Sequence, residues 1–232
     1  MKKILVTILL AAMLPAMFDG CKSSVTAPPD AKFYLINASP DSQGLDFFLD
    51  GSGVVNNLIY SQDTGYFSTS PGIHDLVFKK AGTSKDLVNI NMSLTAGQPY
   101  SIFVIDSVNK LRPAAIADST VVPVGDTVKV RLLNFCIHSP SLIAEFFVDT
   151  SVVLRYFSRT FNDQNSNPSQ TLFSKIIARS YTLNLKRSKD SFLITSFKNI
   201  QLSAGKIYTI YLKGSYDSTN SNSIGEGIVQ HN

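Results

Sequence analysis

Three aspartates within ten positions are the densest group of residues in this chain that could do chemistry. Asp41, Asp46 and Asp50, with the hydroxyl of Ser39 beside them, offer the hard oxygen atoms that Ca²⁺ prefers. A calcium loop needs about six to eight such ligands at fixed positions, and the spacing here differs from it. Asp41 and Asp50 fall where turns are expected, and Asp46 alternates with apolar neighbours. The pattern favours turn and surface carboxylates, so we expect no metal and no other cofactor.

The remaining ionisable side chains form no catalytic pattern. His74, His138 and His231 are scattered singly, with no second ligand at metal-binding spacing. The two glutamates, Glu145 and Glu226, lie far apart in the sequence and suggest no acid/base pair. The sequence also has no Gly-x-Ser-x-Gly elbow and no glycine-rich phosphate loop before a helix. We therefore expect no enzyme activity. A hydrolase remains an alternative function. It would be favoured by a cleft that contains acidic residues or histidines with shifted pKa values.

A polar stretch in the second half of the chain is the best candidate for recognition. It continues to Gln170, and it opens with five residues that we treat as candidate ligand-binding residues: Phe161, Asn162, Asp163, Gln164 and Asn165. Amide side chains suit polar or sugar contacts, and loops on a rigid scaffold commonly carry binding residues. The same side chains also suit plain solvation. The chain has no Trp, the usual sugar-stacking residue, although Tyr or Phe could replace it.

The N-terminus predicts export and a covalent lipid. Lys2 and Lys3 precede an apolar stretch that is shorter than the roughly 20 residues of a membrane span, and Phe18-Asp19-Gly20-Cys21 follows. A small residue directly before such a Cys resembles the lipobox of bacterial lipoproteins. The resemblance implies removal of residues 1–20, acylation at Cys21 with palmitate-type chains, and a lipid anchor in the outer membrane of a Gram-negative cell. Whether the protein faces the periplasm or the cell surface stays open. The alternative is an ordinary cleaved signal with Cys21 as a spare thiol.

Charge and cysteine content narrow the possible partners. The formal net charge is +4, and there is no long run of Lys or Arg, so nucleic acid is not an expected partner. The expected partners are the membrane, through the lipid anchor, and a glycan or another envelope protein. Cys136 lies in an apolar run and is expected to be a buried free thiol, because Cys21 would be lipidated. The sequence gives no oligomeric state.

The chain repeats itself, and the repeat defines the elements that must position these residues. Leu94–Tyr100 (LTAGQPY) recurs as Leu202–Tyr208 (LSAGKIY), and each copy is followed by an alternating apolar run. Short runs rich in Val, Ile, Phe, Tyr and Thr, separated by Gly, Asn, Asp, Ser or Pro, predict strands and almost no helix. We expect an all-β protein of two tandem Ig-like Greek-key β-sandwich domains. The expected segments are a signal peptide at 1–20, a linker at 21–31, and domains at 32–122 and 123–232.

The repeated Leu-x-Ala-Gly-x-x-Tyr unit resembles the tyrosine corner of Greek-key sandwiches. In such a corner the Tyr hydroxyl bonds back to the backbone where a strand crosses between sheets. Tyr100 and Tyr208 are therefore predicted to be structural, and Gly97 and Gly205 would permit the bend. The functional alternative is that these rings stack on a ligand.

A further resemblance comes from Asn37–Asp41 (NASPD) followed by Leu45–Gly51 (LDFFLDG). Together with the Leu-x-Ala-Gly-x-x-Tyr strand, these motifs resemble the bacterial domain-of-unknown-function family 4397. The resemblance is strong in the first copy and loose in the second, over roughly 32–214. It implies an Ig-like sandwich on exported, often surface-associated proteins, and it provides no catalytic residues.

These patterns predict a non-catalytic cell-envelope lipoprotein that acts as a binding or assembly module of unknown ligand. One alternative is a glycan-binding surface protein, for which a Tyr-lined groove near the polar stretch would be expected. The other is a structural accessory subunit of an outer-membrane complex, for which an exposed apolar patch would be expected.

Overall fold

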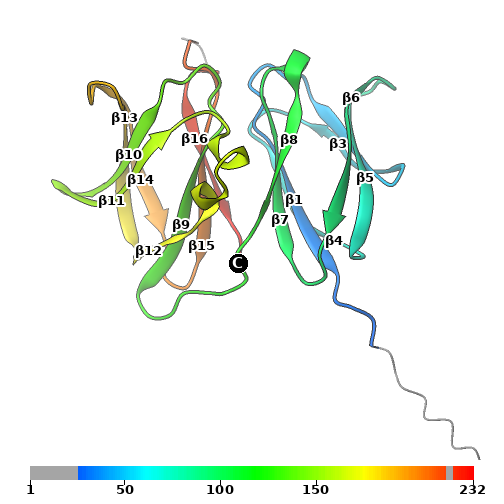
Figure 1. The fold of residues 1–232 in the computed structure, drawn as a ribbon, viewed down its shortest axis with the longest axis horizontal. Coiled ribbons are helices and arrows are strands. Elements are labelled where there is room, and N and C mark those ends of the chain that lie inside the picture. The colour runs from blue at the N-terminus through cyan, green and yellow to red at the C-terminus, as the bar shows by residue number, and fades with distance from the viewer. Residues whose placement is uncertain (1–25, 218–221) are drawn as a thin grey trace, which may run out of the picture.

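The computed structural model describes residues 26–217 and 222–232, and it shows an all-β protein of two sandwich domains (Figure 1). No α-helix occurs among these residues, and three short 3-10 helices lie in loops. The predicted fold class is thus confirmed.

Eight strands and one 3-10 helix form the first domain. Their bounds are β1 (Ala31–Asn37), β2 (Leu45–Leu49), β3 (Ser52–Leu58), β4 (Asp63–Thr69), β5 (Gly72–Lys80), β6 (Asp86–Leu94), β7 (Pro99–Ile105), η1 (Val108–Lys110) and β8 (Arg112–Ala117).

The second domain repeats this plan with two 3-10 helices in a longer loop. Its elements are β9 (Thr127–Asn134), β10 (Leu142–Val148), β11 (Ser151–Arg159), η2 (Asp163–Asn165), η3 (Pro168–Thr171), β12 (Ser174–Ile177), β13 (Arg179–Arg187), β14 (Leu193–Leu202), β15 (Ile207–Lys213) and β16 (Gly225–Gln230).

Both domains use the same strand order in two four-stranded sheets. The first has an inner sheet β4-β1-β7-β8 and an outer sheet β3-β2-β5-β6, and the second has an inner sheet β12-β9-β15-β16 and an outer sheet β11-β10-β13-β14. The first strand of each domain pairs in parallel with the seventh, β1 with β7 and β9 with β15. An eighth strand, β8 or β16, extends each inner sheet, which is one strand more than the immunoglobulin constant-type sandwich has.

The two inner sheets pack against each other, so the molecule has four layers (Figure 1). In β7, Ile102 and Val104 point into the first-domain core, whereas Phe103 and Ile105 point toward the second domain. The Phe103 ring centroid lies 4.8 Å from that of Phe135 in the facing domain. This double burial explains why the second half of β7, Ile102–Ile105, is an unbroken apolar run, as in strands buried on both faces.

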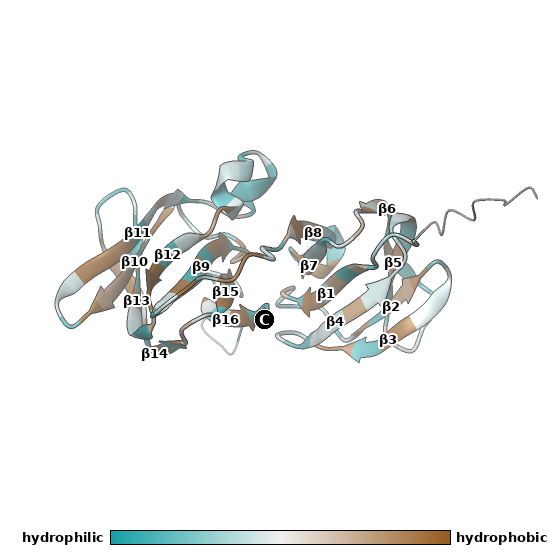
Figure 2. Cartoon of the chain, turned by 90° about the horizontal axis from the view of Figure 1, so that it is seen from below, coloured by the Kyte–Doolittle hydropathy of each residue, from teal (hydrophilic) through white to brown (hydrophobic). Residues whose placement is uncertain are grey.

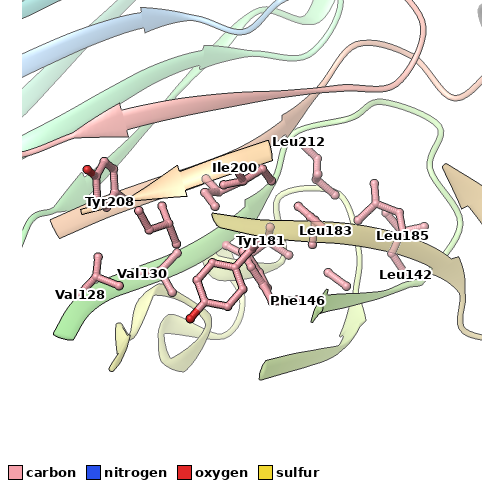
Figure 3. Close-up of a cluster of buried hydrophobic side chains, with 14 of the residues drawn as sticks. Val128, Val130, Leu142, Phe146, Tyr181, Leu183, Leu185, Ile200, Tyr208 and Leu212 are labelled. Atoms are coloured by element: carbon pink, nitrogen blue, oxygen red, sulfur yellow. The ribbon is translucent and has the colours of Figure 1, made fainter. Parts of the chain in front are cut away.

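Each domain also has its own core between its inner and outer sheets. In the second domain, side chains of β9 and β15 meet those of β10, β13 and β14, and Phe146 packs edge-on against Tyr181 (Figure 3). Period-two alternation along β13 supplies Tyr181, Leu183 and Leu185 to this core, with polar residues between them.

The repeated corner has the same geometry in both domains. The Tyr100 hydroxyl accepts a hydrogen bond from the Thr95 backbone N–H, and the Tyr208 hydroxyl accepts one from the Ser203 N–H. Gly97, between Thr95 and Tyr100, has a φ of +71°, which favours glycine.

The strand register defines two ends of the molecule. Ala31 at the start of β1 pairs with Thr69, and Ala117 at the end of β8 pairs with Tyr100, so these residues lie at one end. Residues 26–30 leave the fold from this end, which we call the tether end (Figure 1). The connection from β8 to β9 also lies there. Cys21, the predicted lipidation site, lies outside the described residues.

Candidate functional site

The three clustered aspartates each bind backbone N–H groups of their own domain. Asp41 Oδ1 accepts a hydrogen bond from the Val108 N–H at 2.8 Å. Asp46 accepts bonds from two backbone N–H groups, and Asp50 accepts one and lies 2.7 Å from His74 Nδ1. Asp41 and Asp50 are thus held in turns and Asp46 within β2, each by its own backbone donors. Within 26–217 and 222–232 we find no group of three or more His, Cys, Asp or Glu that could hold a metal ion.

A buried polar network joins the two domains, and its core is an ion pair. Arg131 on β9 and Asp118, just after β8, have fully buried side chains and form this pair. Arg131 also donates to the Ala117 carbonyl at 2.8 Å and to Thr209 Oγ1 at 2.7 Å. Burial lowers the pKa of Arg131, and the Asp118 carboxylate opposes this shift.

The proton positions in this network follow from its two ends. Arg131 Nε can only donate, so the Thr209 oxygen accepts from it, and Thr209 Oγ1 lies 2.7 Å from His231 Nε2. The Asp118 carboxylate can only accept, so Tyr66 donates to it at 2.7 Å and accepts from His231 Nδ1 at 2.8 Å. His231 therefore carries a proton on Nδ1. Because burial also lowers its pKa to about 4, the ring is neutral at pH 7, and Nε2 accepts a hydrogen bond from the Thr209 hydroxyl.

The polar stretch singled out in the sequence is an insertion between β11 and β12, and a second buried ion pair holds it. The connection between β3 and β4 at the same place in the first domain spans only residues 59–62. Arg159, at the end of β11, is fully buried and contacts both carboxylate oxygens of Asp163, at 2.6 and 2.8 Å. Arg159 also donates to the Leu132 carbonyl. Asp163 therefore holds the insertion in place, and both of its carboxylate oxygens are bonded to Arg159 rather than free to bind a ligand.

Two rings of this insertion pack against the junction between the domains. Phe161 lies beside the inter-domain cluster, and the Arg112 guanidinium of the first domain stacks over its ring at 5.3 Å. The Arg131 guanidinium stacks over the Phe173 ring at 4.5 Å. The insertion thus acts as a rigid wall on the second domain, close to β8 of the first.

A cleft of about 380 Å³ runs between this wall and β8. Volumes near this size are common for small binding sites. Three of the five candidate residues, Asn162, Gln164 and Asn165, line it. Pro168 and Thr171 of the insertion and all six residues of β8 complete the lining.

The free edge of β8 faces this cleft. The Asp118 N–H donates to the Pro99 carbonyl, so the alternating antiparallel pattern directs the N–H and C=O groups of 116, 114 and 112 toward β7. The backbone groups of Pro113, Ala115 and Ala117 point the other way. The Ala117 carbonyl bonds to Arg131, and Pro113 has no N–H. For the Ala115 N–H and C=O we find no partner in the described part of the chain.

Gln164 contributes an unsatisfied acceptor to the same wall. The residue is buried, and its Nε2 donates to Asn162 Oδ1 at 2.6 Å, whereas Oε1 has no partner among the described residues. Exchanging the amide O and N would place two oxygens in contact, so either orientation leaves one polar atom unpaired. An unpaired buried acceptor costs about 1–3 kcal/mol, and this oxygen has almost no accessible surface, so a ligand could pair with it only if the Gln164 side chain moved.

A second depression, of about 450 Å³, lies at the end of the first domain opposite the tether end. Its charged lining residues carry both signs, including Lys80, Lys85, Asp41 and Asp86. Asp41 is bound to Val108, and Asp86 is paired with Lys79 at 3.2 Å. The described residues that line this depression include no complete strand, whereas all six residues of β8 line the other cleft, so the β8 cleft is the stronger candidate.

Sequence reasoning missed the half of the site that β8 provides. Residues 112–117 (RPAAIA) carry no functional side chain except Arg112, which is paired with Asp106 at 3.0 Å. The one available signal was Pro113 inside a strand, because proline is typical of edge strands. Cys136 is buried, and burial raises its pKa to about 12, so it is not a reactive thiol.

The family of the first domain follows from comparison with known families. Residues 31–145 match the model of the domain of unknown function DUF4397. The resemblance predicted from the NASPD and LDFFLDG motifs is thus confirmed over this segment. The match covers the first domain and ends within β10 of the second. No curated protein matches the chain.

Two solved structures align with most of the chain at low similarity. The crystal structure of CBMbc (family CBM26) from Eubacterium rectale Amy13K, in complex with maltoheptaose, has 7% identity and a TM-score of 0.26, covering 85% of this chain and 96% of that one. A "putative cell adhesion protein" from Parabacteroides distasonis ATCC 8503 has 9% identity and a TM-score of 0.21, covering 87% and 99%. At these TM-scores neither similarity bears on function.

Within residues 26–217 and 222–232, the structure contains no helix with the length and hydropathy of a membrane span.

Proposed function

We propose that this protein is a non-catalytic lipoprotein of the outer membrane that binds an extended peptide segment of an envelope partner along β8. The observation that carries the proposal is the unpaired edge of β8 inside a cleft with a rigid polar wall. An extended peptide adds to such an edge through alternating main-chain donors and acceptors. The Ala115 N–H and C=O provide one of each.

The chemistry of the lining favours a peptide over a sugar. Among the described residues that line the cleft none is aromatic, so a pyranose ring would find no stacking surface. The alanines of β8 leave room for the alternating side chains of an added strand.

A peptide display library selected on the chain beginning at Cys21 would test the cleft. The diagnostic variant is Ala115→Pro, which removes the N–H that points away from β7. Pro113 occupies an equivalent outward position two residues earlier, so the strand already accommodates proline on this side. We expect the selected peptides to bind this variant at least about tenfold more weakly, because one main-chain bond and the close approach of the strand are both lost. The control, Ala115→Ser, keeps the N–H and should bind within about twofold of wild type. Equal affinity for wild type and Ala115→Pro would contradict the proposal.

The envelope location rests on the motif at Cys21 and has its own test. Labelled palmitate should enter the wild-type protein and not the Cys21→Ala variant. Protease treatment of intact cells then decides the face. Degradation in intact cells would place the folded part on the surface, and protection until the outer membrane is opened would place it in the periplasm. Absence of label from the wild type would contradict the lipid anchor.

A further inference from the structure

The connection from β8 to β9 exposes an unusual run of apolar side chains at the tether end. Residues 121–124 read Val-Val-Pro-Val, and the valines at 121, 122 and 124 are 67%, 51% and 75% exposed. Pro123 is buried between them, so the loop presents three exposed valines within four positions, an apolar grouping that is uncommon on a soluble surface unless it contacts something. Figure 2, which views the molecule from this end, shows a hydrophobic stretch in the connection between β8 and β9.

This loop is held rigidly with its valines outward. Lys129 Nζ donates to the Val121 carbonyl at 2.7 Å, and Thr127 Oγ1 donates to the Val124 carbonyl at 2.6 Å. Ser119 Oγ accepts a bond from the Val121 N–H. Side chains of the loop and of β9 thus satisfy three backbone groups of the loop, at Val121 and Val124. These bonds fix the shape of the loop, which lowers the ordering cost of contact.

The position of the tether identifies the surface that this loop meets. The chain enters β1 at Ala31, at the same end as the loop, and only ten positions separate Ala31 from Cys21. Ten residues span at most about 36 Å when extended. A lipid on Cys21 therefore keeps the tether end close to the bilayer. Two further exposed apolar residues, Ile73 and Ile177, lie near this end, next to Gly72 of β5 and at the end of β12.

We infer that the Val121–Val124 loop inserts into the lipid interface and docks the tether end of the protein on the membrane. The inference rests on the proposed lipid anchor for its orientation. It adds a second, non-covalent contact to that anchor, and two membrane signals hold a protein in a defined pose better than one. Docking in this pose would orient β8 and its cleft along the membrane normal.

The absence of Trp from the chain gives a clean test. The chain beginning at Cys21 is coupled through that thiol to maleimide lipid in phosphatidylcholine vesicles, and buried Cys136 stays unreacted. Because the coupling is chemical, the result does not depend on whether cells acylate Cys21. Val122→Trp reports on the loop, and Phe192→Trp, at a 61% exposed position in the hairpin at the opposite end, is the matched control.

We expect the emission of the Val122→Trp protein to shift to shorter wavelength and to be quenched by brominated lipid, while that of Phe192→Trp stays unchanged. Adding Val121→Ser and Val124→Ser to the Val122→Trp protein should reduce the quenched fraction several-fold, because most of the apolar contact is removed. The same spectrum for both Trp positions, or no quenching at 122, would overturn the inference. Failure of palmitate labelling in cells would instead count against the lipid anchor alone.

Discussion

Asp118 is the residue on which the junction between the domains most depends. It lies in the connection between them and accepts hydrogen bonds from Tyr66 and Ser101 of the first domain and from Arg131 of the second. Both members of its ion pair are fully buried. Removal of one partner from such a pair is much more damaging than replacement of both.

Asp118→Ala should therefore lower the free energy of unfolding by about 3–5 kcal/mol, because Arg131 remains buried without its carboxylate. Urea denaturation measures the loss. The double variant Asp118→Ala/Arg131→Met should lose less than the single variant, since no buried charge is left unpaired. If the single variant is within about 1 kcal/mol of wild type, the ion pair does not anchor the junction between the domains.

His231 makes the stability depend on pH in a definite direction. Its pKa in the folded protein is about 4, against an ordinary value of 6.5, so between these pH values the unfolded chain binds the proton more readily. Its contribution is complete above pH 6.5 and is lost as the pH falls to 4. At about 1.4 kcal/mol per pKa unit, the loss is roughly 3 kcal/mol.

Comparison of wild type with His231→Gln isolates this effect. His74 acts in the opposite direction because Asp50 raises its pKa, but it is present in both proteins and cancels in the difference. The free energy of unfolding of wild type should fall more steeply between pH 6.5 and 4 than that of the variant. Parallel pH profiles would mean that His231 is not held neutral.

The insertion between β11 and β12 is the element that distinguishes the two copies. Arg159 ends β11 where Leu58 ends β3, and the backbone carbonyl of each accepts a bond from an equivalent asparagine, Asn134 or Asn37. The first copy thus shows how the second would look without the insertion, with a leucine in place of the buried arginine.

Replacing residues 159–173 by Leu58–Gln62 of the first copy should leave a folded protein that no longer binds the peptides selected on wild type. Circular dichroism and a binding titration check the two halves of this prediction. A second graft that replaces only 160–173 keeps Arg159 without Asp163 and should be less stable by about 3–5 kcal/mol. Full peptide binding by the first graft would show that the wall of the cleft is dispensable.

The sequence predicts the strands better than it predicts the binding site. The repeated corner motif and alternating runs such as that of β13 report local structure, so the all-β fold could be inferred directly. The insertion was recognised from its polarity, yet only three of its five candidate residues reach the cleft. Asp163 instead pairs with Arg159, and Phe161 supports the domain junction. The Arg131–Asp118–His231 network depends on contacts between sheets, which no local pattern encodes, and the only local sign of the β8 edge was Pro113.

At the scale of the whole molecule, packing between the two inner sheets joins the two domains through a shared buried cluster. Ile36, Phe103, Phe135 and Tyr211 belong to one buried cluster with members from both domains. A shared cluster of this kind, added to the polar network, couples the unfolding of one sandwich to that of the other.

Calorimetry should therefore show one transition, with equal calorimetric and van't Hoff enthalpies. Phe135→Ala, which leaves a cavity against Phe103, should lower the free energy of unfolding by about 3–5 kcal/mol. Two separated transitions in the wild-type protein would indicate that the sandwiches are independent.

Hydrogen exchange along β8 tests the central claim, a peptide-binding edge, most directly. In the free protein the amides of Ala115 and Ala117 point away from β7 and should exchange fast, whereas those of Ala114 and Ile116 should be protected. Addition of a selected peptide should slow exchange at Ala115 and Ala117 and leave Ala114 and Ile116 as they were. Bound peptide that slows exchange elsewhere, while these two amides remain fast, would contradict strand addition to β8.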